Sequence, residues 1–326
     1  MRGLINLNAI GMVAAFSAAF VLNSRYRSQR QGARIPKQAY IGAAIVFAGQ
    51  FLTQLGVAPV AIFFTPIAWT GYILWIDGAI YSLRGRSLLR NNPAEFACLA
   101  LCSIPLWLIF EAYNLRLDNW IYVGLPENWW ARQLGYGWAF ATIWPAIFET
   151  AALLRALDWN SPQFGSAAER GRPLRPAFAA ALSLTGLALV TIPLLVPKQI
   201  GAYLFGAVWL GFIFLFEPIN RLTGRASLWS DLSRGDSSRL RALLWSGVIC
   251  GIFWEFWNWF AAARWFYTVP ILQDWKIFAM PIVGYVRFPI FGVVCFAMFS
   301  MTEPAVNWVR INMGSKEILG FEVLQL

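Results

Sequence analysis

Two similar segments recur in this chain, one in each half. The first reads FEAYNLRLDNWIYVGLP from Phe110 to Pro126, and the second reads WEFWNWFAAARWFYTVP from Trp254 to Pro270. Each holds a glutamate, an asparagine three residues later, a Trp-x-Tyr sequence and a proline. The matched residues are Glu111 and Glu255, Asn114 and Asn258, Trp120 and Trp265, Tyr122 and Tyr267, and Pro126 and Pro270. Such an internal repeat predicts that both halves fold into the same structural unit.

The similarity extends upstream and downstream of these segments. Further matches are Trp69-Thr70-Gly71-Tyr72 with Trp209-Leu210-Gly211-Phe212, Asp77 with Glu217, Gly85–Leu88 with Arg225–Leu228, and Pro145 with Pro289. The repeated unit therefore covers several elements of secondary structure.

The composition indicates that these elements are membrane helices. Of the 326 residues, 59% are hydrophobic and 13% are charged, whereas a soluble domain is near half apolar and a quarter charged. A helix needs about 20 apolar residues to cross a bilayer, and about nine segments of the chain meet this requirement. They are 5–23, 39–56, 58–81, 95–114, 135–157, 177–196, 200–219, 242–262 and 280–301.

We therefore predict an all-α integral membrane protein with about nine transmembrane helices. Residues 1–37 form a leading transmembrane helix and a basic loop, which we interpret as retained because arginines follow the helix. Residues 38–176 form the first four-helix repeat and residues 177–326 the second. An even number of helices per repeat gives parallel repeats, which tend to form a site between them.

The net charge of +10 arises from Lys and Arg residues in the connections between apolar segments. Alternate connections carry most of them, which predicts a bacterial cytoplasmic membrane protein with its N-terminus outside and its C-terminus in the cytoplasm. The same pattern argues against a nucleic-acid partner, and the lipid bilayer is the expected surrounding. The chain has no His and no Cys-x-x-Cys sequence, so we expect neither a metal site nor a cofactor.

Five carboxylates fall in or at the ends of apolar segments: Asp77, Glu111, Glu149, Glu217 and Glu255. A charged side chain costs about 2.5–3.5 kcal/mol at the centre of a membrane helix, so each is a candidate for function. Asp77 and Glu217 lie beside arginines near the predicted cytoplasmic ends. For these two, a structural role between helices and a role in ligand binding are equally supported.

Glu111 and Glu255 each share a helix face with the asparagine three residues later. We interpret the glutamates as acid–base groups, and Asn114 and Asn258 as amides that hold them. Trp120, Tyr122, Trp265 and Tyr267 fit two interpretations: an aromatic belt at the membrane surface, or the wall of a cavity for a polyene, quinone or carbocation-like ligand.

Glu149 and Arg287 break the repeat. Val293 stands at the position that matches Glu149, and Arg287 has no basic counterpart. We expect Glu149 to be a third acid–base candidate. An ion pair between Glu149 and Arg287 across the two halves is the hypothesis that this asymmetry suggests.

Four motifs resemble those of an uncharacterised bacterial family of multi-pass membrane proteins with an internal duplication: WTGYILWID (69–77), GRSLL (85–89), the 110–126 segment and WEFWN (254–258). The sequence Pro145-Ala-Ile-Phe-Glu149 also resembles part of the pattern of lycopene cyclases of carotenoid synthesis, which consist of two tandem three-helix membrane domains. This second resemblance implies an isoprenoid substrate.

The sequence therefore favours a membrane protein that binds or processes a hydrophobic, lipid- or isoprenoid-like ligand between its repeats. Two alternatives stay open: a proton-coupled transporter or flippase, in which the intramembrane acids carry protons, and a non-catalytic subunit with partners in a larger membrane complex.

Overall fold

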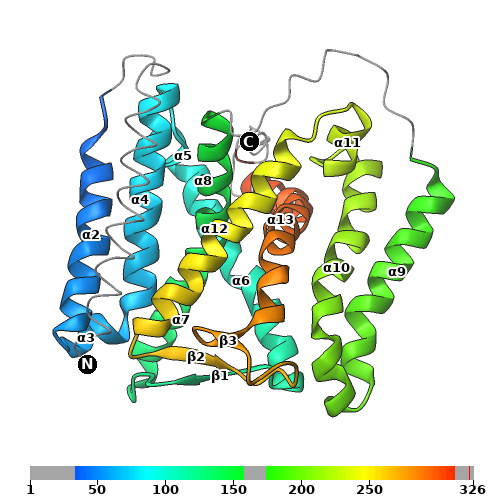
Figure 1. Ribbon diagram of the computed structural model, residues 1–326. Coiled ribbons are helices and arrows are strands. Elements are labelled where there is room, and N and C mark those ends of the chain that lie inside the picture. The colour runs from blue at the N-terminus through cyan, green and yellow to red at the C-terminus, as the bar shows by residue number, and fades with distance from the viewer. Residues whose placement is uncertain (1–33, 158–173, 313–322, 324–326) are drawn as a thin grey trace.

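The computed structural model describes residues 34–157, 174–312 and 323 (Figure 1). The first expected span, 5–23, lies outside these residues. In the first half, the helices are α2 (Lys37–Gln54), α3 (Ala58–Ile62), α4 (Phe64–Arg84), α5 (Leu88–Asn91), α6 (Pro93–Leu117), α7 (Trp129–Ala141) and α8 (Ile143–Ala156). In the second half they are α9 (Pro176–Leu195), α10 (Lys198–Leu222), α11 (Leu228–Ser233), α12 (Ser238–Phe260) and α13 (Arg287–Asn312), with a 3₁₀ turn at Ile282–Val286. The described chain is thus almost entirely helical, as predicted.

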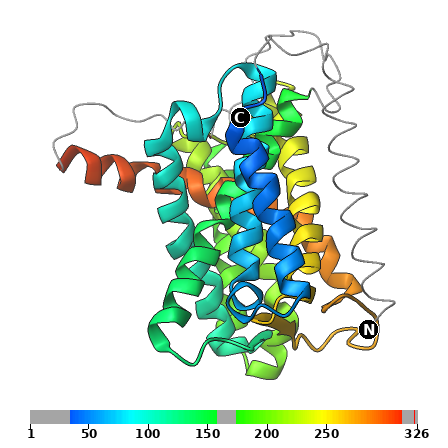
Figure 2. The ribbon, with the colours of Figure 1, turned by 90° about the vertical axis from the view of Figure 1, so that its left-hand side faces the viewer.

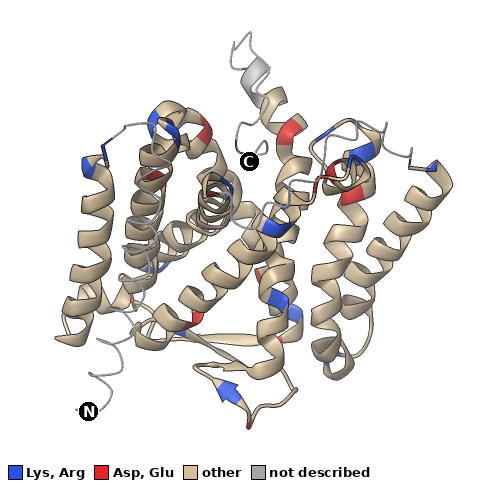
Figure 3. Cartoon of the chain, turned by 45° about the horizontal axis from the view of Figure 1, so that its top comes forward, with Lys and Arg blue, Asp and Glu red and all other residues tan. Residues whose placement is uncertain are grey.

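Six helical segments are long and apolar enough to cross a membrane, which is consistent with an integral membrane protein. They are Pro93–Leu117, Trp129–Ala156, Pro176–Leu195, Lys198–Leu222, Ser238–Phe260 and Ile282–Trp308. Helices α2 and α4, at the expected spans 39–56 and 58–81, are not among the six. Charged side chains lie mainly near helix ends and in the connections (Figure 3).

Two helix pairs flank a central group. The α2–α4 pair lies on one side and the α9–α10 pair on the other, with α6, α8, α12 and α13 between them (Figure 1). Helix α4 packs on α8, α10 packs on α13, and α12 packs on both α8 and α13. The C-terminal part of α13, which contains Pro304, projects sideways from the bundle (Figure 2). The first and second halves therefore meet along α8, α12 and α13.

Two of the expected spans are each broken into two helices. The span 58–81 is interrupted at Phe63, and the span 135–157 is interrupted at Thr142. A proline follows each break by three residues, Pro66 in α4 and Pro145 in α8. Proline lacks the N–H that would bond to the carbonyl four residues earlier, so a continuous helix loses a hydrogen bond at that point.

Pairs of glycines allow helices to approach closely. In the α2–α4 pair, a Cβ on Gly42 would lie 2.4 Å from the carbonyl oxygen of Gly71. In the α9–α10 pair, a Cβ on Gly186 would lie 2.7 Å from the carbonyl oxygen of Gly211. Small residues at helix crossings are the common means of packing membrane helices, and the two flanking pairs use them at matching positions.

The two Trp-x-Tyr segments form strands that pair with each other. Strand β1 (Trp120–Val123) is antiparallel to β2 (Arg264–Tyr267), with Trp120 opposite Tyr267 and Tyr122 opposite Trp265. Strands β3 (Lys276–Ile277) and β4 (Met280–Pro281) form a second small sheet. The β1–β2 sheet joins the two halves at one end of the bundle (Figure 1), which we call the strand end.

Candidate functional site

Glu111 and Glu255 each accept a hydrogen bond from a tyrosine of the neighbouring strand. The hydroxyl of Tyr122 donates to Glu111 Oε1 over 2.6 Å, and the hydroxyl of Tyr267 donates to Glu255 Oε1 over 2.6 Å. Trp107 Nε1 also donates to Glu111 Oε1, over 2.8 Å. The repeat therefore places a Glu–Tyr pair in each half, at the ends of α6 and α12.

Burial raises the pKa of the Tyr267 phenol well above its ordinary value, and the neighbouring Glu255 carboxylate raises it further. The hydroxyl of Tyr267 therefore stays protonated and donates to Glu255. Trp265 Nε1 in turn donates to the Tyr267 hydroxyl over 2.8 Å, so indole, phenol and carboxylate form a chain of hydrogen bonds.

The asparagines do not hold the carboxylates, and that prediction is wrong. Asn114 Nδ2 donates to the carbonyl oxygen of Trp120 over 2.8 Å, and Asn114 Oδ1 accepts from the main-chain N–H of Asn119 and Trp120. Asn258 makes the same pair of bonds with the main chain of Trp265. Because an amide both donates and accepts, it satisfies the main chain where each helix turns into its strand. The role of Asn114 and Asn258 is to position the strands.

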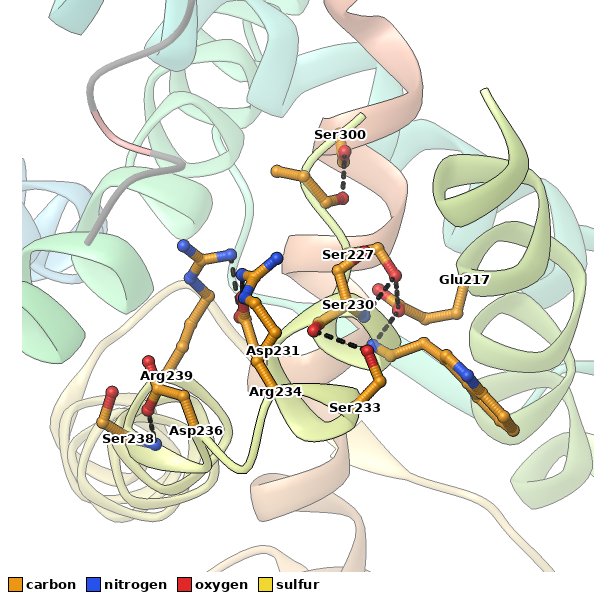
Figure 4. Close-up of polar contacts among 12 residues, drawn as sticks. Glu217, Ser227, Ser230, Asp231, Ser233, Arg234, Asp236, Ser238, Arg239 and Ser300 are labelled. Carbon is orange, nitrogen blue, oxygen red and sulfur yellow. Dashed lines mark hydrogen bonds and ion pairs between the residues drawn. The ribbon is translucent and has the colours of Figure 1, made fainter. Parts of the chain in front are cut away.

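Asp77 and Glu217 lie at the end of the bundle opposite the strands, where each one binds the start of a short helix. Asp77 accepts from Ser87 Oγ and from the N–H of Leu89, each over 2.8 Å, and also from Gln38. Glu217 accepts from Ser227 Oγ over 2.9 Å and from the N–H of Trp229 over 3.2 Å (Figure 4). Acids are favoured at helix N-termini, so these contacts give both residues a structural role.

A cavity of about 130 Å³ lies between the two halves near the strand end. Its lining is rich in aromatic side chains from both halves. Besides Phe63, the aromatic lining residues are Trp69, Trp107, Trp120, Tyr122, Tyr136, Phe140, Phe205, Trp209, Trp254, Trp265, Tyr267, Phe288 and Phe291. Among the lining residues, Phe63, Leu125 and Tyr136 are half-buried, whereas Ile143, Ala146 and Cys250 are buried.

Rings from the two halves interleave in this wall. Trp107 of α6 lies 5.2 Å from Trp254 of α12, measured between ring centroids, and Trp254 lies 6.3 Å from Trp69 of α4. Trp107 also lies 6.0 Å from Phe291 of α13. Such tilted and edge-on pairs leave ring faces turned in several directions, so a ligand in the cavity would meet aromatic faces on more than one side.

Five of the twelve sequence-predicted residues line the cavity: Trp120, Tyr122, Trp265, Tyr267 and Arg287. Glu111 and Glu255 are not lining residues, but each is bonded to a tyrosine that is. Asn114, Asn258, Asp77, Glu217 and Glu149 also lie outside the lining. The cavity thus groups the aromatic candidates and places the two glutamates one hydrogen bond behind its surface.

The hypothesis of a Glu149–Arg287 ion pair is wrong. The guanidinium of Arg287 lies 4.9 Å from the ring centroid of Tyr267, and one of its nitrogens contacts the sulfur of Met280 at 3.7 Å. Glu149 is 2% exposed, and its Oε1 has no hydrogen-bond partner among the described residues. Arg287 stands two turns before Val293, the match of Glu149, and so lies nearer the strand end.

A group of buried polar side chains adjoins the cavity at Cys250. The hydroxyls of Tyr72 and Thr150 are 2.8 Å apart, and Thr150 Oγ1 is 3.4 Å from the sulfur of Cys250. Cys250 itself lines the cavity. None of the four cysteines, all of which the structure describes, forms a disulfide, and the described residues contain no group of His, Cys, Asp and Glu that could hold a metal ion.

Sequence reasoning missed several lining residues, notably Trp107, Arg132, Tyr136, Trp209 and Trp254. Two signals were present. Trp107 precedes Glu111 by one helical turn and Trp254 directly precedes Glu255. Arg132 is the one charged residue of α7, which starts at Trp129. A search for aromatic residues within one turn of each repeated glutamate would have found both tryptophans.

Comparison with known proteins identified no relative of this chain. No protein family, no curated protein and no solved structure matches the chain.

Proposed function

We propose that the protein binds a hydrophobic, lipid- or isoprenoid-like ligand in the aromatic cavity between its halves. The single observation that carries this proposal is the aromatic cavity that both halves build near the strand end. An apolar cavity of about 150 Å³ holds a benzene ring. A cavity of about 130 Å³ therefore takes a ring or an isoprene unit, and a longer chain extends beyond it.

The Glu–Tyr pairs give this site acid–base chemistry. Tyr122 and Tyr267 line the cavity and donate to Glu111 and Glu255. In the proposed reaction the tyrosines exchange protons with the ligand, and the glutamates accept or return those protons. The surrounding ring faces stabilise positive charge that develops on an isoprenoid when it is protonated. The likeness to lycopene cyclases suggests the same substrate class.

The matched contacts of the two halves support an architecture of two parallel repeats after a leading helix, nine spans in all. In this arrangement α2, α4, α6 and α8 correspond to α9, α10, α12 and α13. We place the strand end outside a bacterial cytoplasmic membrane and the arginine-rich end, with α5 and α11, in the cytoplasm. The N-terminus is then outside and the C-terminus is cytoplasmic.

Glu149 favours a second candidate function, proton-coupled transport. Its buried carboxyl has one oxygen without a partner in the described part of the chain, and it lies near Asp77 of α4. A buried acid without a cationic partner is a typical proton-binding group in transporters. A flux into liposomes that depends on a pH gradient and is lost in Glu149→Gln would support transport over ligand chemistry.

Filling the cavity should remove the bound ligand. Ala139 is half-buried in the cavity wall, so Ala139→Phe places a ring in the space the ligand needs. We expect solvent extraction of the wild-type protein, purified in mild detergent, to yield about one hydrophobic compound per chain by mass spectrometry. The Ala139→Phe variant should lose most of it, about tenfold or more.

The matched control is Ala152→Phe, at a half-buried alanine of α8 outside the lining. It adds the same side chain to the same kind of helix surface and should keep the compound. Equal recovery of the compound from wild-type protein and Ala139→Phe would contradict the proposed site.

A further inference from the structure

The cavity carries positive charge and no negative charge. Two charged residues line it, Arg132 of α7 and Arg287 at the start of α13, and no carboxylate stands among its described lining residues. One arginine comes from each half. A purely hydrocarbon ligand would gain nothing from two cations beside its cavity. It would also remove water from the two guanidinium groups, which costs free energy.

Neither arginine is neutralised by an ion pair within the described residues. Arg132 Nε donates to the carbonyl oxygen of Pro126 over 3.1 Å, and another of its nitrogens donates to the carbonyl oxygen of Glu127 over 3.4 Å. Arg287 contacts the Tyr267 ring and the Met280 sulfur. Glu255 and Arg287 interact electrostatically but form no ion pair: Glu255 Oε1 accepts from Tyr267, and its Oε2 has no hydrogen-bond partner among the described residues. Most of the ten N–H donors of the two guanidinium groups stay available.

A third donor in the cavity wall also lacks a partner. Trp209 is 5% exposed and lines the cavity, and its Nε1 has no hydrogen-bond acceptor among the residues that the structure describes. Buried indole N–H groups usually find an acceptor. The wall thus combines two cations with an unused neutral donor, a set that suits a ligand with acceptor oxygens.

We propose that the ligand is an amphiphile whose head group is a phosphate ester, bound between Arg132 and Arg287, with its apolar chain among the tryptophans. This inference rests on the proposed function. A phosphate monoester carries a charge of about −1.5 to −2 near neutral pH, which matches two arginines better than a single carboxylate does. Guanidinium groups bind phosphate oxygens in bidentate fashion.

The test compares farnesyl monophosphate with farnesol, which share one hydrocarbon chain, and with oleate, which carries a carboxylate. Binding to the wild-type protein in maltoside micelles is measured from the rise in melting temperature with probe concentration, because a ligand of the native state stabilises it by mass action. We expect farnesyl monophosphate to bind at least about tenfold more tightly than farnesol or oleate.

Arg132→Gln and Arg287→Gln should each remove about tenfold or more of this preference and leave farnesol binding unchanged. Arg287→Lys keeps the charge without the bidentate geometry, so this variant should retain part of the preference for farnesyl monophosphate. The matched control is Arg264→Gln. Arg264 also lies over a ring at the strand end, 4.9 Å from the Phe266 centroid, and is not a lining residue, so its loss should change nothing.

The outcomes separate this inference from the proposed function. Equal binding of farnesyl monophosphate and farnesol, both lost in Ala139→Phe, overturns the head-group inference and keeps the cavity. A phosphate preference that persists in both arginine variants also overturns the inference, because the head group then binds elsewhere. Binding of neither probe to the wild-type protein overturns both proposals.

Discussion

Gly292→Ala should destabilise the protein by about 3 kcal/mol or more, at the upper end of the range for overpacking. A Cβ on Gly292 of α13 would lie 2.0 Å from the carbonyl oxygen of Leu243 in α12. The contact is with main chain, so no side chain can rotate away, and the two helices must separate. The expected result is a large fall in the melting temperature of the detergent-solubilised protein, followed by tryptophan fluorescence.

The crossing is reciprocal, so Gly247→Ala should have the same effect. A Cβ on Gly247 would lie 2.0 Å from the carbonyl oxygen of Phe288. The matched control is Gly206→Ala in the exposed part of α10, where a Cβ meets nothing within 4 Å. That variant should be neutral or more stable by up to about 1 kcal/mol, since alanine favours helix over glycine. Equal stability of Gly292→Ala and Gly206→Ala would refute this α12–α13 packing.

Replacing both repeated glutamates should abolish proton exchange with the ligand. In D₂O, a ligand that is protonated and deprotonated in the cavity incorporates deuterium, which mass spectrometry detects without knowledge of the final product. Glu111→Gln combined with Glu255→Gln removes both carboxyls and keeps an oxygen to accept from Tyr122 and Tyr267. Loss of general acid–base catalysis should slow incorporation by about 10²–10⁴-fold.

The double variant should keep its melting temperature and its bound ligand. Glu217→Gln is the control, because it removes a buried carboxyl at the opposite end of the bundle, beside α11. It should exchange deuterium at the wild-type rate. Failure of the double variant to fold would show instead that the glutamates serve to hold helix ends to strands. Unchanged deuterium incorporation in a folded double variant would exclude them from the chemistry.

The sequence predicted the helices well because long apolar segments have few alternatives in a membrane. The sequence did not predict the two helix breaks that precede Pro66 and Pro145 by about one turn, because the apolar character of the chain continues through both breaks. It also failed at the Trp-x-Tyr segments. These strands are too short to show a period of two, and each becomes a strand only by pairing with the other half of the chain.

The candidate site was predicted in part for a similar reason. The sequence grouped Glu111 with Tyr122 and Glu255 with Tyr267, and in the structure each tyrosine donates to its glutamate. It could not show that Tyr stands between Glu and the cavity, because that depends on the β1–β2 sheet. The predicted role of Asn114 and Asn258 was wrong. Helix spacing puts both on the same face as the glutamates, but their amides bond to the main chain of the following strand instead. Arg132 has no repeat partner to mark it.

The central claim is that both halves together bind an amphiphile in the aromatic cavity. An experimental structure of the protein in nanodiscs made from its native lipids tests this most directly. We predict elongated density packed against the rings of Trp107 and Trp254, with its head between Arg132 and Arg287 and its tail leaving past Phe63. A well-resolved cavity that holds only water, or that is closed by the surrounding side chains, would contradict the account.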